Sequence, residues 1–531
     1  MKIAMSSFAE TLFNIEVIIV GAGVAGASAA LYLARSGVSN VHVLECGKVG
    51  KGVQTGRALV PHACIRDGDV DTHPNESSTA FPFARMSGTA AFDPTARKNI
   101  ATAASEGISP PCDDNVSAMK MMLVIFPCSS KEFILHHGIE GAKRYLKLAQ
   151  QGIYLEKKLA TELLKGVPGG MKELGSLYVC TGEDVDEFRE EFETLSRLIV
   201  GTDIAVEWWD DEEKVQQVSG CSSFVRAIWF PGDAVIDSSA FSRALLKAAT
   251  QTGCVTLVEN CPSVVGVETI DTAQGPHAIV QLSDGSSLKA KHVVVATGGL
   301  FMERNLAGIL TPCWSYIVSL KDLEGGKSGK GAATREGVGI DEEAAEATST
   351  NPNLNPNQAT CTDSTSCGDS PALPSGHPLR LRWPDSPNFF TWGFSHDWCL
   401  TRGFLRCSGE DHFSALKPPR AMERCQALAE WALEKYPYLE ADLDFRYGVY
   451  SETPDRCAIV GIPHPDSRIC YLLGCNASGQ APLSFAASLI PGLLGYRRLT
   501  EEQLDLFKVM NIRRFALLQC VMEKNTGTVC Y

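Results

Sequence analysis

The stretch from Val17 to Gly37 reads VIIVGAGVAGASAALYLARSG. An apolar, β-branched run comes first, glycines with the spacing G-x-G-x-x-G follow, and a run of small, helix-forming residues comes next. A second apolar run, VHVLE, ends at Glu45. This order predicts a buried strand, a tight turn, a helix that ends at Gly37 and a second strand.

The glycines of this stretch predict a phosphate-binding turn. The first permits the tight turn, the second lets the backbone approach a pyrophosphate, and the third lets the helix pack close to the sheet. The helix N-terminus attracts the anion through its free N–H groups. Glu45 ends the second strand, where a carboxylate accepts hydrogen bonds from ribose hydroxyls and repels a 2′-phosphate. We therefore expect a dinucleotide, not of the NADP type, to contact Gly21, Ala22, Gly23, Val24, Ala25, Gly26 and Glu45.

The composition narrows the class of protein. The chain has 531 residues, 44% of them hydrophobic, so two or more structural units are expected. Its net charge of -14 argues against nucleic acid or an anionic membrane as partner. The 19 cysteines include no C-x-x-C pair, which favours free thiols in a reducing compartment. Without a secretory pattern at the start or an apolar run of about 20 residues, we expect a soluble cytoplasmic protein with no membrane span and no metal.

Further along the chain, helical and flexible segments are indicated. Apolar residues recur at helical spacing from Ile139 to Leu163, which predicts one long helix or two. Asp237 is placed to cap a helix that Gly253 ends, and another helix is expected over about 422–436. Two polar, turn-rich stretches, 68–117 and 321–379, are predicted to be long low-complexity insertions.

Three later stretches bear on which dinucleotide is bound. GKGVQTGRAL follows the second strand and places Thr55, Gly56 and Arg57 where a second phosphate or a flavin could lie. VVVATGG, ending at Gly299, predicts a buried strand whose small terminal residues can pass beneath a nucleotide. From Tyr471, YLLGCNASGQAPLSFAASLIPGLL predicts a strand, a glycine turn and an apolar helix.

In combination and order, these motifs resemble the FAD-dependent oxidoreductases of the D-amino-acid oxidase, glycine oxidase and sarcosine oxidase family. The family has an N-terminal G-x-G-x-x-G with a ribose-binding acid, a middle strand that ends in A-T-G, and a late T-P-D segment. Here the T-P-D segment is GVYSETPDRCAIVG, from Gly448 to Gly461, and the final glycine turn is GCNASG. DLFKVMNIRRF, ending at Phe515, is similar to the segment that closes the family's chains.

The resemblance implies an α/β fold in which a Rossmann-like FAD-binding domain is intertwined with an antiparallel-sheet substrate domain. The FAD-binding domain is expected to take 14–67, 236–300 and 445–500, the substrate domain 118–235 and 301–444, and a helical tail 501–531. The resemblance further implies non-covalent FAD, with additional contacts from Val265, Ala296, Thr297, Gly298, Gly474, Asn476, Ser478 and Gly479.

By the same resemblance, the chemistry is oxidation of the C–N bond of an amino acid or secondary amine. Hydride passes to flavin N5, water hydrolyses the imine, and oxygen or an electron carrier is the final acceptor. Arg406 is the first candidate to bind a substrate carboxylate, and Tyr450 is the second, as a hydroxyl donor. Family members often carry G-x-R-P before T-P-D, but this chain has Tyr450-Ser451, so its substrate wall is expected to differ.

Two other functions stay open at this point. The same fold oxidises the C–OH of 2-hydroxy acids in some relatives, and no single residue here separates the two chemistries. A protein that holds FAD as a structural part and serves as an interaction module would also fit the two long insertions. Reduction of the flavin by a panel of amines and hydroxy acids would discriminate among the three.

Overall fold

The computed structural model describes residues 15–49, 119–122, 125–167, 170–299, 306, 308–322, 389–392, 396–401, 404–413, 420–437 and 439–515. Thr55, Gly56 and Arg57 lie outside these residues, as does the expected insertion over 68–117. The expected insertion over 321–379 also lies outside them, except for its first two residues.

The first large sheet has five parallel strands at its centre. Their order is β9-β2-β1-β12-β19, with β1 (Ile15–Val20), β2 (Val41–Glu45), β9 (Val255–Glu259), β12 (Ser287–Val295) and β19 (Ile469–Leu473). β18 (Ile459–Gly461) pairs with β19 in the antiparallel direction. β10 (Val264–Thr272), β11 (Gly275–Leu282) and β12 form an antiparallel meander, and Asp284-Gly285 lie in its second turn.

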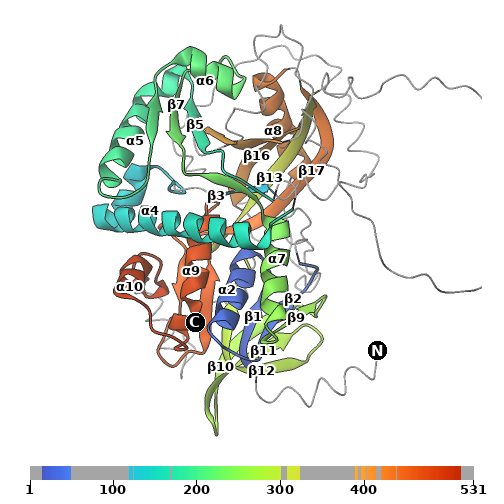
Figure 1. Ribbon diagram of the computed structural model, residues 1–531. Coiled ribbons are helices and arrows are strands. Elements are labelled where there is room, and N and C mark those ends of the chain that lie inside the picture. Colours follow the sequence, from blue (N-terminus) through green and yellow to red (C-terminus); the bar gives the residue numbers. More distant parts are fainter. Residues whose placement is uncertain are drawn as a thin grey trace, which may run out of the picture.

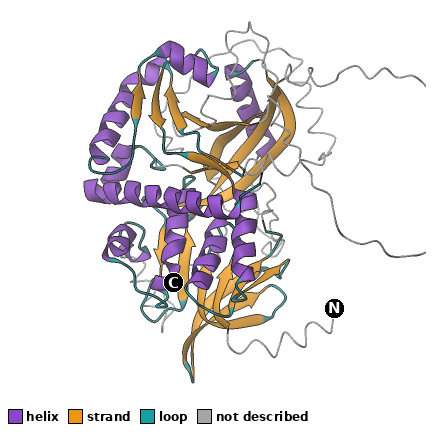
Figure 2. Cartoon of the chain, viewed as in Figure 1, coloured by secondary structure: helices purple, strands orange, loops and turns teal. Residues whose placement is uncertain are grey.

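Helices cover one face of this sheet. α2 (Val24–Arg35), α7 (Ser238–Gln251) and α9 (Gln480–Leu493) stand side by side in Figures 1 and 2. Their apolar faces join Val17 and Ile19 of β1 in one buried cluster. On the other face, Ile18 and Val20 pack against apolar residues of the meander. The predicted strand–turn–helix–strand at the start of the chain is confirmed.

The second large sheet forms the other end of the molecule. Its order is β17-β13-β16-β15-β14-β5-β7-β6. These strands are β5 (Ser176–Cys180), β6 (Glu207–Trp209), β7 (Arg226–Phe230), β13 (Thr311–Asp322), β14 (Phe389–Trp392), β15 (His396–Thr401), β16 (Phe404–Phe413) and β17 (Leu439–Glu452). α8 (Ala421–Lys435) packs against the face that carries Leu405 and Cys407. The expected boundary at 445 falls inside β17, which stays paired with β13 to Glu452.

The remaining helices and strands join the two ends. α4 (Ser130–Leu163) runs across the molecule between the two sheets in Figure 1. The helical spacing predicted one helix or two, and the structure has one helix kinked at Gly138, which has φ 67°. β3 (Met119–Met122), β8 (Ala234–Asp237) and β4 (Met171–Lys172) form a small third sheet, and α5 (Val185–Leu198), α6 (Glu212–Ser219) and α10 (Glu501–Phe507) complete the described helices.

Two local predictions are also confirmed. Asp237 caps α7, since its side chain accepts a hydrogen bond from the Ala240 N–H at 2.8 Å. The helix expected over about 422–436 is α8. Within the described part of the chain, no helix combines the length and the apolar character that a membrane crossing requires.

Candidate functional site

The turn between β1 and α2 has the geometry that its three glycines predict. Gly21 has φ +102°, and a side chain there would overlap the carbonyl oxygen of Ala296. A side chain at Gly26 would overlap the carbonyl oxygen of Gly21, so α2 packs directly on the turn. At Gly23, in contrast, no atom of the described residues lies within 4 Å of where a side chain would begin. The turn is therefore closed where it meets the sheet and open at the glycine where a phosphate would approach.

The start of α2 is suited to an anion. Its N-cap residue is Gly23, no described side chain caps the helix, and no acidic residue lies in the first turn. Glu45 lies beside this turn, and its carboxylate accepts the N–H of Ala22 at 3.0 Å and the N–H of Gly47 at 3.0 Å. Oε1 also accepts the Cys46 thiol at 3.8 Å, so Oε2, which accepts only the Ala22 N–H among the described donors, has a second lone pair for a ligand hydroxyl. Val24 and Ala25 form the first residues of the helix.

The end of the middle strand passes under the same turn. The Ala296 N–H donates to the Val20 carbonyl at 2.9 Å, which continues the pairing of β12 with β1. Thr297 and Gly298 follow, and Gly298 has φ +66°. A side chain at Gly299 would lie 2.7 Å from the backbone of Val449. The two large sheets therefore meet backbone to backbone at this point, which small residues alone permit.

Ser451 joins this middle turn to the final glycine turn. Its hydroxyl donates to the Gly298 carbonyl at 3.0 Å and accepts the Gly474 N–H at 3.2 Å. Its carbonyl accepts the Asn476 N–H at 3.1 Å. One residue of the T-P-D segment thus holds two segments that lie almost 180 residues apart in the sequence. Sequence reasoning noted Ser451 only as a departure from the family pattern and did not foresee this role.

The final glycine turn is held in an unusual backbone conformation. Gly474 has φ 75°, and Asn476 and Ala477 have φ 47° and 61°, a region that costs ordinary residues about 1–2 kcal/mol each. The buried Asn476 side chain compensates, because its Oδ1 accepts the Thr453 N–H at 2.8 Å and its Nδ2 donates to the Gly474 carbonyl at 2.8 Å. Strain of this kind, fixed by its surroundings, is typical of a binding site.

α9 begins directly after this turn. We expected donors around Ser478 and Gly479, but the Ser478 N–H donates to the Asn476 carbonyl at 2.7 Å inside the turn. Gly479 is the N-cap residue, and no described side chain caps the helix. The first N–H groups of a helix have no acceptor within it, so Gln480 and Ala481 offer the donors. α2 and α9 follow parallel strands of one sheet, so both helices start at the same edge.

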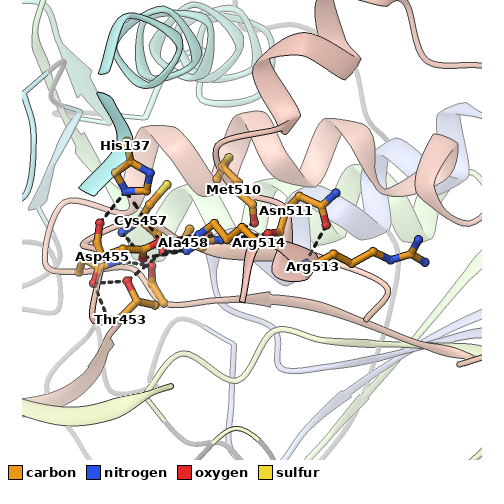
Figure 3. Close-up of polar contacts among 11 residues, drawn as sticks. His137, Thr453, Asp455, Cys457, Ala458, Met510, Asn511, Arg513 and Arg514 are labelled. Atoms are coloured by element: carbon orange, nitrogen blue, oxygen red, sulfur yellow. Dashed lines mark hydrogen bonds and ion pairs between the residues drawn. The ribbon is translucent and has the colours of Figure 1, made fainter. Parts of the chain in front are cut away.

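An ion-pair network fixes the T-P-D loop behind this edge (Figure 3). Arg514 donates to both carboxylate oxygens of Asp455, at 2.5 and 2.9 Å, and to the carbonyls of Cys457 and Ala458 at 2.6 and 2.9 Å. His137 of α4 lies 2.7 Å from the Asp455 carbonyl. Burial alone would raise the pKa of Asp455, but the hydrogen bonds and charge of Arg514 outweigh it and lower that pKa.

The second sheet presents a polar face opposite α8. Leu405, Cys407 and Val449 pack in the core with α8, and side chains alternate along a strand, so Arg406 and Tyr450 both lie on the other face. Tyr450 is at the end that meets Gly299, and its hydroxyl lies 2.8 Å from Asp411 Oδ2 and 3.1 Å from Glu452 Oε1. Burial, and then the charge of Asp411, raise the pKa of Tyr450 well above its usual value.

Arg406 lies much further along this face than Tyr450. Arg406 is paired with Ser319 of β13, whereas Tyr450 is paired with Cys313. Six residues of strand correspond to about 20 Å. Arg406 is buried, with 7% of its surface exposed. The two predicted substrate-binding residues therefore share a face, but a small substrate held beside Gly299 would meet Tyr450 first.

Val265 is the one described member of the predicted cofactor-binding set that lies on the meander. It is 49% exposed and falls at the irregular step between Val264 and Gly266 in the pairing of β10 with β11. The other described residues of the predicted set gather at the ends of β1, β2, β12 and β19. Small residues, open space at Gly23, two uncapped helix starts and the Glu45 carboxylate together fit a dinucleotide that carries two phosphates and a ribose.

Comparisons with known proteins agree with this geometry. The model of the family described as FAD dependent oxidoreductase matches residues 16–490. The fold is similar to glycine oxidase from Geobacillus kaustophilus, with a TM-score of 0.57 and 15% identity over 91% of this chain and 95% of that chain. It is also similar to L-proline dehydrogenase from P. horikoshii, with a TM-score of 0.56 and 15% identity over 95% and 98%.

A third similar structure is fructosyl amine: oxygen oxidoreductase (Amadoriase I) from Aspergillus fumigatus. Its TM-score is 0.55, with 13% identity over 96% of this chain and 91% of that chain. At these identities the structures establish the shared fold, while the family match covers most of the chain. No curated protein matches the sequence.

Proposed function

Since the chain belongs to the family of FAD dependent oxidoreductases, we propose that it oxidises the C–N bond of an amino acid or a secondary amine. The protein is an FAD-dependent enzyme by this membership. The observation that supports the proposal is the bonding of Ser451 to Gly298 and Gly474, which brings the polar face of the second sheet up to the edge where α2 and α9 begin.

Different turns of the chain are assigned to different parts of FAD. The backbone from Gly21 to Gly26 and the start of α2 take the pyrophosphate, and Glu45 takes the ribose hydroxyls of the adenosine half. The turn from Ala296 to Gly298 would lie against the bound nucleotide. The flavin end is assigned to the turn from Gly474 to Gly479 and to the first N–H groups of α9. From the sequence alone, Thr55, Gly56 and Arg57 are assigned to the flavin end as well.

In the proposed reaction, the C–H bond next to the substrate nitrogen breaks and the nitrogen lone pair forms the second bond of an imine. When bound, FAD supplies the redox chemistry by accepting the hydride, which carries both electrons, and oxygen or an electron carrier later removes those electrons. Water then adds to the imine, and its C–N bond breaks to give a carbonyl compound and the amine or ammonia. The chain supplies position and exclusion of water.

The described helix start at α9 stabilises negative charge that develops on the cofactor. Uncapped N–H groups at a helix N-terminus stabilise an anion by about 0.3–1 kcal/mol at an exposed site, and by more when partly buried. Gln480 and Ala481 lie in this first turn, and Ala481 is buried. This contribution is available before reaction, because the turn is already fixed by Asn476.

Substrate binding is assigned to the face that carries Tyr450. Its hydroxyl lies beside two carboxylates, and the backbone of Tyr450 lies against Gly299. Arg406 stays the candidate for a substrate carboxylate only if the substrate is long enough to extend up the sheet. We propose a cytoplasmic location, consistent with the lack of any C-x-x-C pair among the 19 cysteines of the sequence.

A substrate panel tests the proposed function directly. The purified enzyme, loaded with FAD, is mixed without oxygen with amino acids, secondary amines and 2-hydroxy acids, and the flavin absorbance is followed. The proposal expects bleaching by at least one amine or amino acid. Bleaching by hydroxy acids alone would instead assign oxidation of a C–OH bond, and no bleaching by any compound would favour a non-catalytic role.

Tyr450→Phe tests the assigned substrate wall once a reducing substrate is known. Loss of the hydroxyl removes its bonds to Asp411 and Glu452 and changes the wall beside Gly299, so we expect kcat/KM to fall at least tenfold, about 1.4 kcal/mol, with FAD affinity unchanged. Tyr447→Phe is the matched control, because Tyr447 lies on the opposite face of the same strand, near Trp314. An equal fall in both variants would contradict the assignment.

A further inference from the structure

Glu156 is a buried carboxyl group that the proposed reaction does not use. It lies on α4 with no exposed surface. Its Oε1 accepts a hydrogen bond from Gln480 Nε2 at 2.8 Å and another from the Ser484 hydroxyl. Gln480 is the first residue of α9, and Ser484 follows about one turn later. Glu156 therefore contacts the helix that begins at the final glycine turn, within its first two turns.

The backbones of α4 and α9 touch at the same place. A side chain at Gly152, one turn before Glu156, would overlap the carbonyl oxygen of Ala481. Two helices this close can shift little, so a polar contact between them sets the position of α9 along α4. Further along α4, His137 contacts the Asp455 carbonyl. One helix thus supports the T-P-D loop and the start of α9.

The surroundings of Glu156 do not balance its charge. Among the described residues, Oε2 has no hydrogen-bond partner, and the nearby hydroxyl of Tyr32 on α2 has none either. Burial raises the pKa of Glu156 to about 7, and the bonds from Ser484 and Gln480 lower it only in part. Burial raises the pKa of Tyr32 to about 12, with Arg35 and Arg497 within electrostatic reach of it. Arg35 pairs with Glu162, and Arg497 donates to the Ser488 carbonyl.

We propose that Glu156 is a positioning residue for the flavin. Its bonds fix the first turn of α9 at the position along α4 where the N–H groups of that turn can contact the cofactor. This inference rests on the proposed assignment of α9 to the flavin end of FAD. Burial of a carboxyl group costs free energy that an apolar side chain of similar size would not cost. If α9 needed only packing at this place, an apolar residue would therefore stabilise the fold more than Glu156 does. The two bonds from Glu156 are directional, and directional bonds fix a helix in one position.

The test compares three variants of the full-length protein. Glu156→Ala removes both bonds, while Glu156→Gln keeps an oxygen that can accept them and cannot ionise. Glu191→Ala is the matched control for the loss of both bonds. Glu191 is also a buried carboxyl group, on α5, and it accepts bonds from the N–H and hydroxyl of Ser130 at the far end of α4. The dissociation constant of FAD, the flavin midpoint potential and the thermal unfolding temperature are measured for each.

We expect Glu156→Ala to weaken FAD binding at least tenfold and to make the midpoint potential more negative. A tenfold loss of preference for the reduced flavin corresponds to about 30 mV. Glu156→Gln should restore FAD affinity to within about threefold of the wild type. Above pH 7 the ionised Glu156 of the wild type opposes negative charge on the flavin, so its potential should fall more steeply with pH than that of Glu156→Gln.

Two results would overturn the inference. One is wild-type FAD affinity and potential in Glu156→Ala, and the other is an equal loss in Glu191→Ala, which would show a general effect of destabilising α4. Failure of the proposed function itself appears differently. In that case the wild type binds no FAD, or binds it without reduction by any amine, whatever Glu156 contributes.

Discussion

At the scale of single residues, the three glycines of the first turn have different roles. Substitution by alanine distinguishes an effect on stability from an effect on FAD affinity. Gly23→Ala places a methyl group in open space at φ −65°, so the free energy of unfolding should change by no more than about 0.5 kcal/mol. The same methyl group blocks the approach of a phosphate, so FAD affinity should fall at least tenfold. Urea unfolding and FAD titration measure the two effects independently.

Gly26→Ala is the contrasting variant. Its methyl group would overlap the Gly21 carbonyl oxygen, and relief requires α2 to move from the sheet, which should cost about 1–3 kcal/mol of stability. If Gly23→Ala destabilised the fold as much as Gly26→Ala while FAD still bound normally, the assignment of the phosphate to this turn would be wrong.

His292 gives a prediction about acid sensitivity. Its side chain on β12 is buried, and burial, followed by the charges of Arg468 and Lys291, lowers its pKa to about 4. Between pH 6.5 and 4 the unfolded chain binds a proton that the folded chain does not, so acidification destabilises the fold. At pH 5 this amounts to about 2 kcal/mol. The loss is complete only below pH 4.

Comparison of His292→Gln with the wild type isolates this contribution. Urea unfolding at pH 7 and pH 5 should show a loss of stability that is about 2 kcal/mol smaller in the variant. His464→Gln serves as control, because His464 lies near the surface beside Asp466. An equal loss in His292→Gln and the wild type would mean that other groups account for acid sensitivity.

At the scale of helices and loops, the T-P-D loop depends on one arginine. The guanidinium of Arg514 reaches Asp455, two loop carbonyls and the carbonyls of Met510 and Asn511, an arrangement that needs its planar set of donors. Arg514→Lys keeps the charge but loses most of these bonds. We expect about 2 kcal/mol of destabilisation and faster hydrogen exchange over 453–458.

Arg513→Lys is the control for this loop. Arg513 donates to the Ile462 carbonyl only through Nε and lies at an exposed position. Its replacement should leave exchange over 453–458 unchanged. Unchanged exchange in Arg514→Lys as well would show that the loop is held by Asn476 and Ser451 without the ion pair.

The elements differ in how far the sequence predicts them. The β1–α2–β2 unit and α7 follow from local signals, namely glycine spacing, an Asp cap and apolar periodicity. The roles of Ser451 and Glu156 cannot be predicted from local signals. Each residue bonds to a partner that lies more than 150 residues away in the sequence. The T-P-D segment was recognised from its resemblance, yet the bonds that make it a connector come from side chains with no local pattern.

At the scale of the whole molecule, two sheets meet along a narrow backbone contact, with α4 lying across both (Figure 1). The strand–turn–helix–strand at the start of the chain was predicted from the first motif, and the pairing of a Rossmann-like unit with an antiparallel sheet was predicted from the resemblance. The sequence did not predict that β17 continues across the expected domain boundary at residue 445. An antiparallel edge strand that continues into a loop shows no change in composition at such a boundary.

The central claim is that the turns at Gly21–Gly26, Ala296–Gly299 and Gly474–Gly479 hold a single FAD. The most direct measurement is the flavin content of the purified full-length protein after incubation with excess FAD. We predict one FAD per chain, released into the supernatant by acid precipitation because it is bound without a covalent link. A colourless protein that takes up no FAD would contradict the claim, and flavin retained in the acid pellet would contradict its non-covalent form.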